Sequence, residues 1–234
     1  MKNKFTSIKN IVLGLTITLN SAYSFADTII SAAGATQGVS GSSGLTGQYW
    51  KVDARSTDLS IEKTLNLINS NKVNGTFISS DVNYSGRDFS TIKQFIGNDG
   101  NSFVGLNNSM SDGIVKMDGF IKITTPSTIN FSMYSDDVAQ LEINGQKLIS
   151  TSYNNAGTTN AFFSKAGFYA VDIIYSNTAT VDGKGGATLK LTENNQIPNN
   201  FYQNVSAVPE PETYAMLLAG LGLMGFMSRC RKNS

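Results

Sequence analysis

Asp136 and Asp137 form the one pair of adjacent aspartates in the sequence, close behind an alternating run that ends at Tyr134. Calcium binds about six to eight oxygen atoms, supplied by carboxylates, amide and backbone carbonyls, and water. The pair is therefore a candidate for the charged part of a calcium site. The alternative interpretation is a solvated turn, because aspartates are common in turns and loops.

Two further polar stretches are weaker candidates for binding. Asn98–Asn101 has some features of a calcium loop, but it lacks the alternating ligands and terminal glutamate of the EF-hand. Its Asp-Gly dipeptide favours a plain turn. Tyr153–Asn155 could flank a ligand, but a surface loop is the favoured interpretation. We expect Tyr49 and Trp50 to lie in the core rather than to stack against a sugar.

Histidine is absent from the sequence, and this excludes several kinds of catalytic site. Ser-His-Asp catalysis, Cys-His catalysis and histidine-ligated zinc all need that residue. A glycosidase would need two carboxylates about 5 to 9.5 Å apart, and no motif fixes such a pair. We therefore predict that the protein is not an enzyme. The single cysteine, Cys230, lies near the C-terminus, so we expect no disulfide in the mature protein.

The second half of the chain has the alternating pattern of β-strands. Apolar residues alternate along Thr128–Tyr134, Tyr169–Tyr175 and Ala187–Leu191. Asn144-Gly145 separates two more alternating runs, which is a strong hairpin signal. A bend or bulge is expected at Asp118-Gly119. Because alternation gives each strand one buried and one wet face, the pattern predicts an antiparallel sandwich.

The first half of the chain predicts one or two short helices. Apolar residues recur at helical spacing within Leu59–Ile68, and Asp58 or Ser60 can cap that helix. Phe89–Phe95 is a second short helix or an irregular link. Val73–Gly86 is polar and rich in turn formers. The fold class predicted from the residues is therefore all-β, an antiparallel β-sandwich with one or two short helices in the N-terminal half.

Four stretches together resemble the domain named after anthrax protective antigen, a β-sandwich found in adhesins, toxins and glycosidases. They are Gly44–Tyr49, Phe131–Gly145, Ala166–Tyr175 and Gly185–Leu191. The resemblance covers roughly residues 44 to 191 and is specific from Phe120 onward. Within that family the pattern is nearest to flocculin-type adhesins, which bind sugars through calcium.

The resemblance implies a set of calcium ligands. In those adhesins two successive aspartates, joined by a cis peptide bond, bind the ion with a later asparagine and two backbone carbonyls. The corresponding residues here are Asp136, Asp137 and Asn177, with the carbonyls of Ala179 and Val181. Neighbouring side chains on a trans strand point to opposite faces, whereas a cis bond would bring both carboxylates to one side. Sugar hydroxyls would fill the remaining coordination positions.

The sequence also departs from the adhesin pattern. Val138 follows the aspartate pair where the wider family often has glycine. The loop Thr178–Gly186 lacks the aromatic residue that some adhesins place there. Asp182 in this loop is either an additional ligand or a turn former before Gly183. Because sugar specificity resides in such loops, it does not follow from the resemblance.

The N-terminus has the three parts of a secretory signal peptide. Three lysines lie within the first nine residues, and the apolar run Ile11–Leu19 follows them. Ser24-Phe25-Ala26 has the small-x-small pattern of a cleavage site. We therefore expect the mature chain to begin near Asp27. A transmembrane helix is the weaker interpretation, because the apolar run is too short.

The C-terminus begins with Val208, Pro209, Glu210 and Pro211, continues with the apolar run Tyr214–Met227, and ends in a basic cluster. As a helix this run covers about 21 Å, less than the 30 Å or so of a bilayer core. The pattern resembles a PEP-CTERM sorting signal, which exosortases of Gram-negative bacteria recognise and remove. The resemblance implies exosortase as a partner and transient membrane contact through the C-terminal helix. The basic residues are Arg229, Arg231 and Lys232.

The sequence thus predicts five segments: a signal peptide (1–26), a flexible segment (27–43), a β-sandwich domain (44–193), a linker (194–207) and a sorting signal with a short hydrophobic helix (208–234). Without the six basic residues of the two signals, 12 basic residues remain against 17 acidic ones, a net charge of −5. Removing Glu210 and Glu212 as well gives −3. Nucleic acid is not an expected partner of this mildly acidic body.

These features predict an exported protein at the cell surface or in the extracellular matrix. We expect it to bind extracellular polysaccharide or another glycan with calcium as cofactor, and to act in adhesion or in the matrix. Its candidate ligand-contacting residues are Asp136, Asp137, Asn177 and Asp182. The alternative is a structural matrix protein of the same fold without a sugar site.

Overall fold

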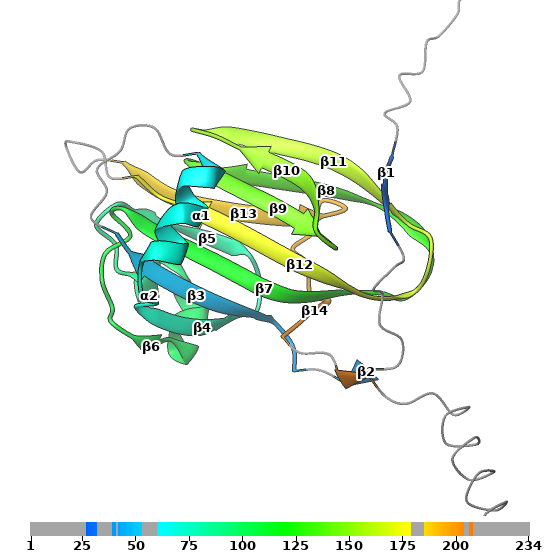
Figure 1. Cartoon of the computed structure of the whole chain (residues 1–234), viewed down its shortest axis with the longest axis horizontal. Helices are drawn as coiled ribbons and strands as arrows, with labels where there is room; N and C mark the ends of the chain where they lie inside the picture. Colours follow the sequence, from blue (N-terminus) through cyan, green and yellow to red (C-terminus); the bar gives the residue numbers. More distant parts are fainter. Residues whose placement is uncertain are drawn as a thin grey trace, which may run out of the picture.

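Alternating apolar residues build two β-sheets that face each other in a computed structural model of the protein (Figure 1). The structure describes residues 27–31, 39–40, 42–52, 60–178, 185–203 and 206–207. The expected signal peptide and sorting signal lie outside these residues. The all-β fold and the antiparallel sandwich with few short helices are confirmed.

The larger sheet has eight strands, and its centre is formed by β12 and β7, which pair along ten residues. In spatial order the strands are β10 (Gln146–Thr151), β9 (Val138–Ile143), β12 (Gly167–Ser176), β7 (Gly113–Ile123), β3 (Leu45–Lys51), β4 (Gly75–Ser79) and β6 (Val104–Gly105), while β14 (Phe201–Tyr202) pairs with β7.

The smaller sheet has five strands, and one of its edges is the parallel pair of β1 with β11. Its strands, in spatial order, are β1 (Thr28–Ile30), β11 (Asn155–Phe163), β8 (Ser127–Ser135), β13 (Gly186–Glu193) and β5 (Asn83–Arg87). A separate two-stranded sheet joins β2 (Val39–Ser40) to β15 (Ser206–Ala207).

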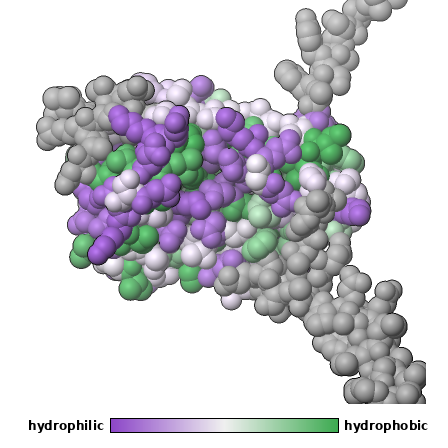
Figure 2. All heavy atoms as spheres, in the orientation of Figure 1, coloured by the Kyte–Doolittle hydropathy of each residue, from purple (hydrophilic) through white to green (hydrophobic). Residues whose placement is uncertain are grey.

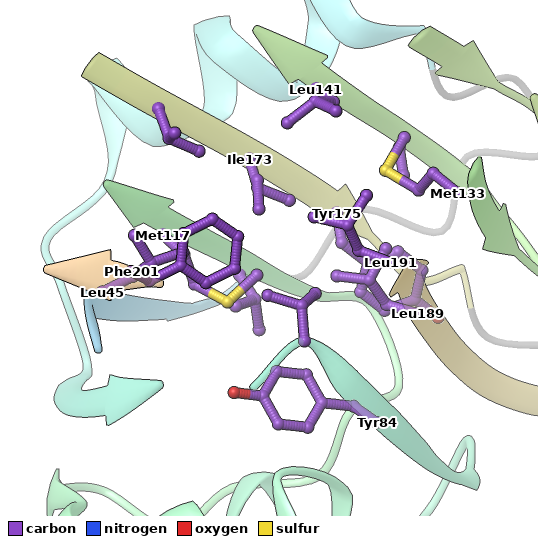
Figure 3. Packing of buried hydrophobic residues seen from close by; sticks show 14 of the residues in the cluster. Leu45, Tyr84, Met117, Met133, Leu141, Ile173, Tyr175, Leu189, Leu191 and Phe201 are labelled. Atoms are coloured by element: carbon purple, nitrogen blue, oxygen red, sulfur yellow. The ribbon is translucent and has the colours of Figure 1, made fainter. Parts of the chain in front are cut away.

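The core lies between the inner faces of the two main sheets (Figure 3). Met117 and Ile173 of the larger sheet and Met133 and Leu189 of the smaller one are all buried there. Burying one such side chain stabilises the fold by about 1.5–3 kcal/mol. Tyr49 is also in this core, as expected. The outer face of the larger sheet is mostly hydrophilic in Figure 2, in agreement with the alternating pattern.

Each of the two short α-helices begins after a residue whose side chain caps its N-terminus. Ser60 is the N-cap of α1 (Ile61–Ser70), where its hydroxyl accepts a 3.2 Å hydrogen bond from the Lys63 amide. Thr91 and Gln94 form a capping box at the start of α2 (Ile92–Phe95). The 3₁₀ helix η1 (Gly97–Ser102) follows. Both helices fall within or next to the segments that the sequence suggested.

The expected bend at Asp118-Gly119 is wrong, because β7 runs without interruption from Gly113 to Ile123. The glycine serves close packing instead. A Cβ at Gly119 would lie 2.5 Å from the Tyr202 carbonyl oxygen and 2.9 Å from the Leu45 side chain. A side chain at this position would therefore push β14 off the sheet.

Several segments without a clear sequence pattern also form strands. Val73–Gly86, expected to be turn-rich, contains β4 and part of β5. Within the segment expected to be flexible, Ile30 is fully buried in the core. Within the expected linker, Phe201 is buried in the same core. The folded body therefore includes residues on both sides of 44–193.

The burial of Ile30 leads to a test of the N-terminal strand. Replacing Ile30 by alanine should lower the free energy of unfolding by about 2–5 kcal/mol, because it leaves a cavity in the core. The neighbouring Ile29 is 68% exposed, so Ile29→Ala should change that free energy by less than about 0.5 kcal/mol. Urea denaturation of both variants gives the comparison, and equal costs would contradict the placement of β1.

Candidate functional site

Four strand ends meet at one end of the sandwich. In the smaller sheet, β8 pairs with β13, and β13 pairs with β5 through Gly186 and Arg87. In the larger sheet, β12 ends at Ser176. The residues that continue these strands are Asp136 after β8, Asp88 after β5 and Asn177 after β12. The fold thus brings together polar residues that are far apart in the sequence.

Asp136 is the central residue of this end and is only 8% exposed. Its Oδ1 accepts a 2.6 Å hydrogen bond from the Tyr175 hydroxyl and a 2.9 Å bond from the Thr188 amide. Its Oδ2 is buried and has no hydrogen-bond partner among the residues that the structure describes. A Cβ at Gly186 would lie 3.1 Å from that Oδ2, so the glycine keeps the space beside it free of a side chain.

Asn177 is fully buried beside Asp136. Hydrogen bonds of its side-chain amide fix its orientation. The Nδ2 atom donates to the Met110 carbonyl at 2.9 Å and to Asp88 Oδ1 at 3.3 Å. Its Oδ1 lies 3.0 Å from the Tyr175 hydroxyl. A phenol has one hydrogen, and Asp136 and Asn177 share it as acceptors. Asp136 Oδ1 and Asn177 Oδ1 therefore accept fewer hydrogen bonds from the described residues than their lone pairs allow.

Asp137 lies beside the same strand ends but is partly exposed. Its Oδ2 accepts a 2.7 Å hydrogen bond from the Thr178 amide, and its carbonyl accepts a hydrogen bond from the Ser135 hydroxyl. The peptide bond between Asp136 and Asp137 is trans, which corrects the cis bond implied by the resemblance. The pair forms a corner between β8 and β9 rather than part of a straight strand, so both carboxylates reach the end of β12.

Burial raises the pKa of both adjacent carboxyl groups. For Asp136 burial is the largest cause, and hydrogen bonds from Tyr175 and Thr188 oppose it. For Asp137 burial raises the pKa to about 6, against the lowering effect of the Thr178 amide. Asp88 raises the pKa of both groups further by charge repulsion. A divalent cation at this point would favour the ionised form of each carboxyl group.

The described residues provide only part of the calcium site that the resemblance implies. Ala179, Val181 and Asp182 lie outside them. Within the described ranges, no group of three or more His, Cys, Asp and Glu side chains is arranged to hold a metal ion. The structure brings together the carboxylates of Asp136 and Asp137 and the amide oxygen of Asn177. Asp88 accepts a hydrogen bond from the Asn177 amide nitrogen. Carboxylate and amide oxygens are ligands that calcium uses.

The other sequence candidates have structural roles or lie at the edge of the site. Asp99, in η1, accepts hydrogen bonds from the Ser80 amide and hydroxyl and from the Tyr84 hydroxyl, which ties η1 to the core. Trp50 is buried beneath α1 and cannot stack against a sugar. Tyr153 is 73% exposed in a loop next to the site, where the neighbouring Asn154 amide donates to the Asp136 carbonyl at 2.7 Å.

Sequence reasoning missed the roles of Asp88 and of the Tyr175 hydroxyl. Asp88 follows a strand whose pattern is weak, and no motif surrounds it. Tyr175 lies buried in β12, on the apolar face of the alternating run Tyr169–Tyr175. A buried tyrosine needs a partner for its hydroxyl, and this was the one available signal that a polar group lies opposite.

Residues 207–232 match the PEP-CTERM protein-sorting motif. The chain carries a PEP-CTERM sorting signal at its C-terminus. This motif indicates export and sorting to the surface, and it implies processing by an exosortase. In the part of the chain that the structure describes, no helix is long and apolar enough to cross a membrane.

The sandwich is similar to several solved domains. The PA14 domain of the MpAFP antifreeze protein aligns with a TM-score of 0.56 and 20% identity, over 68% of this chain and 86% of that one. The PA14 sugar-binding domain of an RTX adhesin aligns with a TM-score of 0.52 and 24% identity, over 69% of this chain and 98% of that one. The A domain of Epithelial Adhesin 6 from Candida glabrata, solved with Galb1-3GlcNAc, aligns with a TM-score of 0.54 and 10% identity. The alignment covers 75% of this chain and 96% of that one.

These similarities show the fold of the body, a PA14-like β-sandwich that is also found in adhesins. No curated protein matches the chain. These three neighbours are described as an antifreeze-protein domain, a sugar-binding domain of an adhesin and an adhesin domain.

The raised pKa of Asp137 gives the metal-free protein a distinct pH dependence. Above its ordinary pKa of 3.8 the unfolded Asp137 is ionised, whereas the folded one keeps its proton up to about pH 6. The stability that this group contributes is therefore greatest below pH 4 and decreases as pH rises to about 6. Asp137→Asn should flatten this decrease, as measured by urea denaturation in chelator between pH 4 and 7. An unchanged slope would contradict the assignment.

Proposed function

We propose that the protein is an exported carbohydrate-binding domain in which Asp136, Asp137 and Asn177 hold calcium, and calcium holds the sugar. The domain would act in cell adhesion or in the exopolysaccharide matrix, after exosortase removes the C-terminal tail. The sorting motif and the adhesin-like neighbours support this role.

One observation carries the calcium proposal, namely the buried Oδ2 of Asp136, which accepts no hydrogen bond from any residue within the described ranges. A buried carboxylate oxygen without a partner is costly, because the charged group has lost its water. The repulsion from Asp88 and Asp137 adds to that cost. Calcium held by Asp136, Asp137 and Asn177 would compensate both effects. Because the carbonyls of Ala179 and Val181 could complete only part of the coordination sphere, sugar hydroxyls or water would fill the rest.

A second candidate function is a structural matrix protein of the same fold without a sugar site. The trans bond between Asp136 and Asp137 favours it, because it departs from the arrangement that the adhesin resemblance implies. The two candidates differ in their response to calcium and to glycans, which the following two measurements separate.

Calcium should stabilise residues 27–207, with the melting temperature rising by about 5–10 °C at saturating calcium and returning in chelator. Asp136→Asn should remove this response, because the amide cannot supply the second carboxylate oxygen. Asp99→Asn is the matched control, since Asp99 is another buried aspartate but is held by Ser80 and Tyr84. This control should melt at a lower temperature and keep the calcium response. A wild-type protein that does not respond to calcium would contradict the metal site.

On a glycan array, the wild-type protein should bind a defined set of glycans in calcium, and chelator should abolish that binding. Asp136→Asn should bind none of them while remaining folded by circular dichroism. Binding that persists in chelator would overturn the role of calcium. A folded, calcium-responsive protein that binds no glycan would instead support the structural matrix protein.

A further inference from the structure

The segment before the sorting signal is fixed to the folded domain. Phe201 packs in the core and pairs with Ile121 through β14 and β7. Its carbonyl accepts a 2.8 Å hydrogen bond from the Gly44 amide. The Gln203 amide then donates to the Ser42 carbonyl at 2.9 Å, and the Gln203 side chain donates to the next carbonyl, also at 2.9 Å.

This attachment continues to the first residue of the sorting motif. Ser206 and Ala207 form β15, which pairs with Ser40 and Val39 of β2. The apolar run of the signal begins at Tyr214, so six residues separate it from the last paired one. A chain of this length spans at most about 25 Å even when fully extended. The folded domain is therefore confined to a short distance from the apolar run while the tail is present.

The point of attachment and the acidic site lie far apart along β7 and β12. Tyr202 pairs with Phe120 of β7, which in turn pairs with Ala170 of β12. From Ala170 the strand continues for six residues to Ser176, directly before Asn177. At about 3.3 Å per residue along the strand, this places the site about 20 Å from the level of β14.

We propose that the exported precursor is held at the membrane with its β14 end facing the bilayer surface and the Asp136 end facing away. The apolar run Tyr214–Met227, with its basic end, enters the bilayer. The attachment of residues 201–203 and 206–207 then determines which end of the domain faces the lipid. This orientation leaves the acidic site accessible from outside before the tail is removed. It depends on the sorting signal and not on calcium or sugar binding.

Energy transfer to labelled lipid measures this orientation. After Cys230→Ser removes the one native cysteine, Lys165→Cys and Tyr153→Cys place a dye at opposite ends of β11. These ends are about 27 Å apart by strand geometry. Both positions are exposed. The precursor, taken from cells without exosortase, is bound to phosphatidylethanolamine–phosphatidylglycerol vesicles that carry an acceptor lipid.

We expect transfer from position 165 to be at least about twice as efficient as transfer from position 153. A spacer of 15 glycine and serine residues between Ala207 and Val208 should leave the fold unchanged and make the two efficiencies nearly equal. The control that ends at Ala207 should remain in solution. Equal transfer without the spacer, or a precursor that does not bind the vesicles, would overturn the proposal. Neither result depends on glycan binding.

Discussion

The hydrogen bond between the Tyr175 hydroxyl and Asp136 connects the two sheets at the end where the candidate site lies. Tyr175 belongs to β12 of the larger sheet, and Asp136 follows β8 of the smaller one. The Tyr175 ring stacks on the Phe95 ring, with 5.6 Å between the two ring centroids, so core packing fixes the position of the Tyr175 hydroxyl. The Thr188 amide holds the same carboxylate oxygen from β13. Through these contacts, the packing of the core determines where the acidic group points.

The arrangement costs the metal-free protein stability. Three aspartates lie at one end of the sandwich, and burial raises the pKa of two of them. Lys116 and Asp172 form an ion pair on the outer face of the larger sheet, away from this cluster. Proteins commonly keep such unfavourable local features at functional sites, where a ligand compensates them. A bound cation would offset the repulsion among these aspartates, which core packing does not.

The sequence predicted the strands whose side chains alternate, because burial on one face leaves a period of two. It also predicted the Asn144-Gly145 hairpin, where both residues have the positive φ angles that this turn needs. It could not predict β1 and β14, since strands of two or three residues are too short to show a period. The contact between Asn177 and Asp88 depends on strand order across 89 residues. The resemblance to adhesins predicted that Asn177 belongs to the site, which the local sequence pattern could not. Neither the resemblance nor the pattern pointed to Asp88.

The two ends of the sandwich have separate tasks in this account, since one holds the acidic site and the other holds the sorting tail. A crystal structure of residues 27–207 grown in millimolar calcium shows whether the first end binds the ion. We expect one ion within about 2.3–2.6 Å of Asp136 Oδ2 and Asn177 Oδ1. A well-ordered structure in calcium that has no ion there, with Asn177 Oδ1 still next to the Tyr175 hydroxyl, would contradict it.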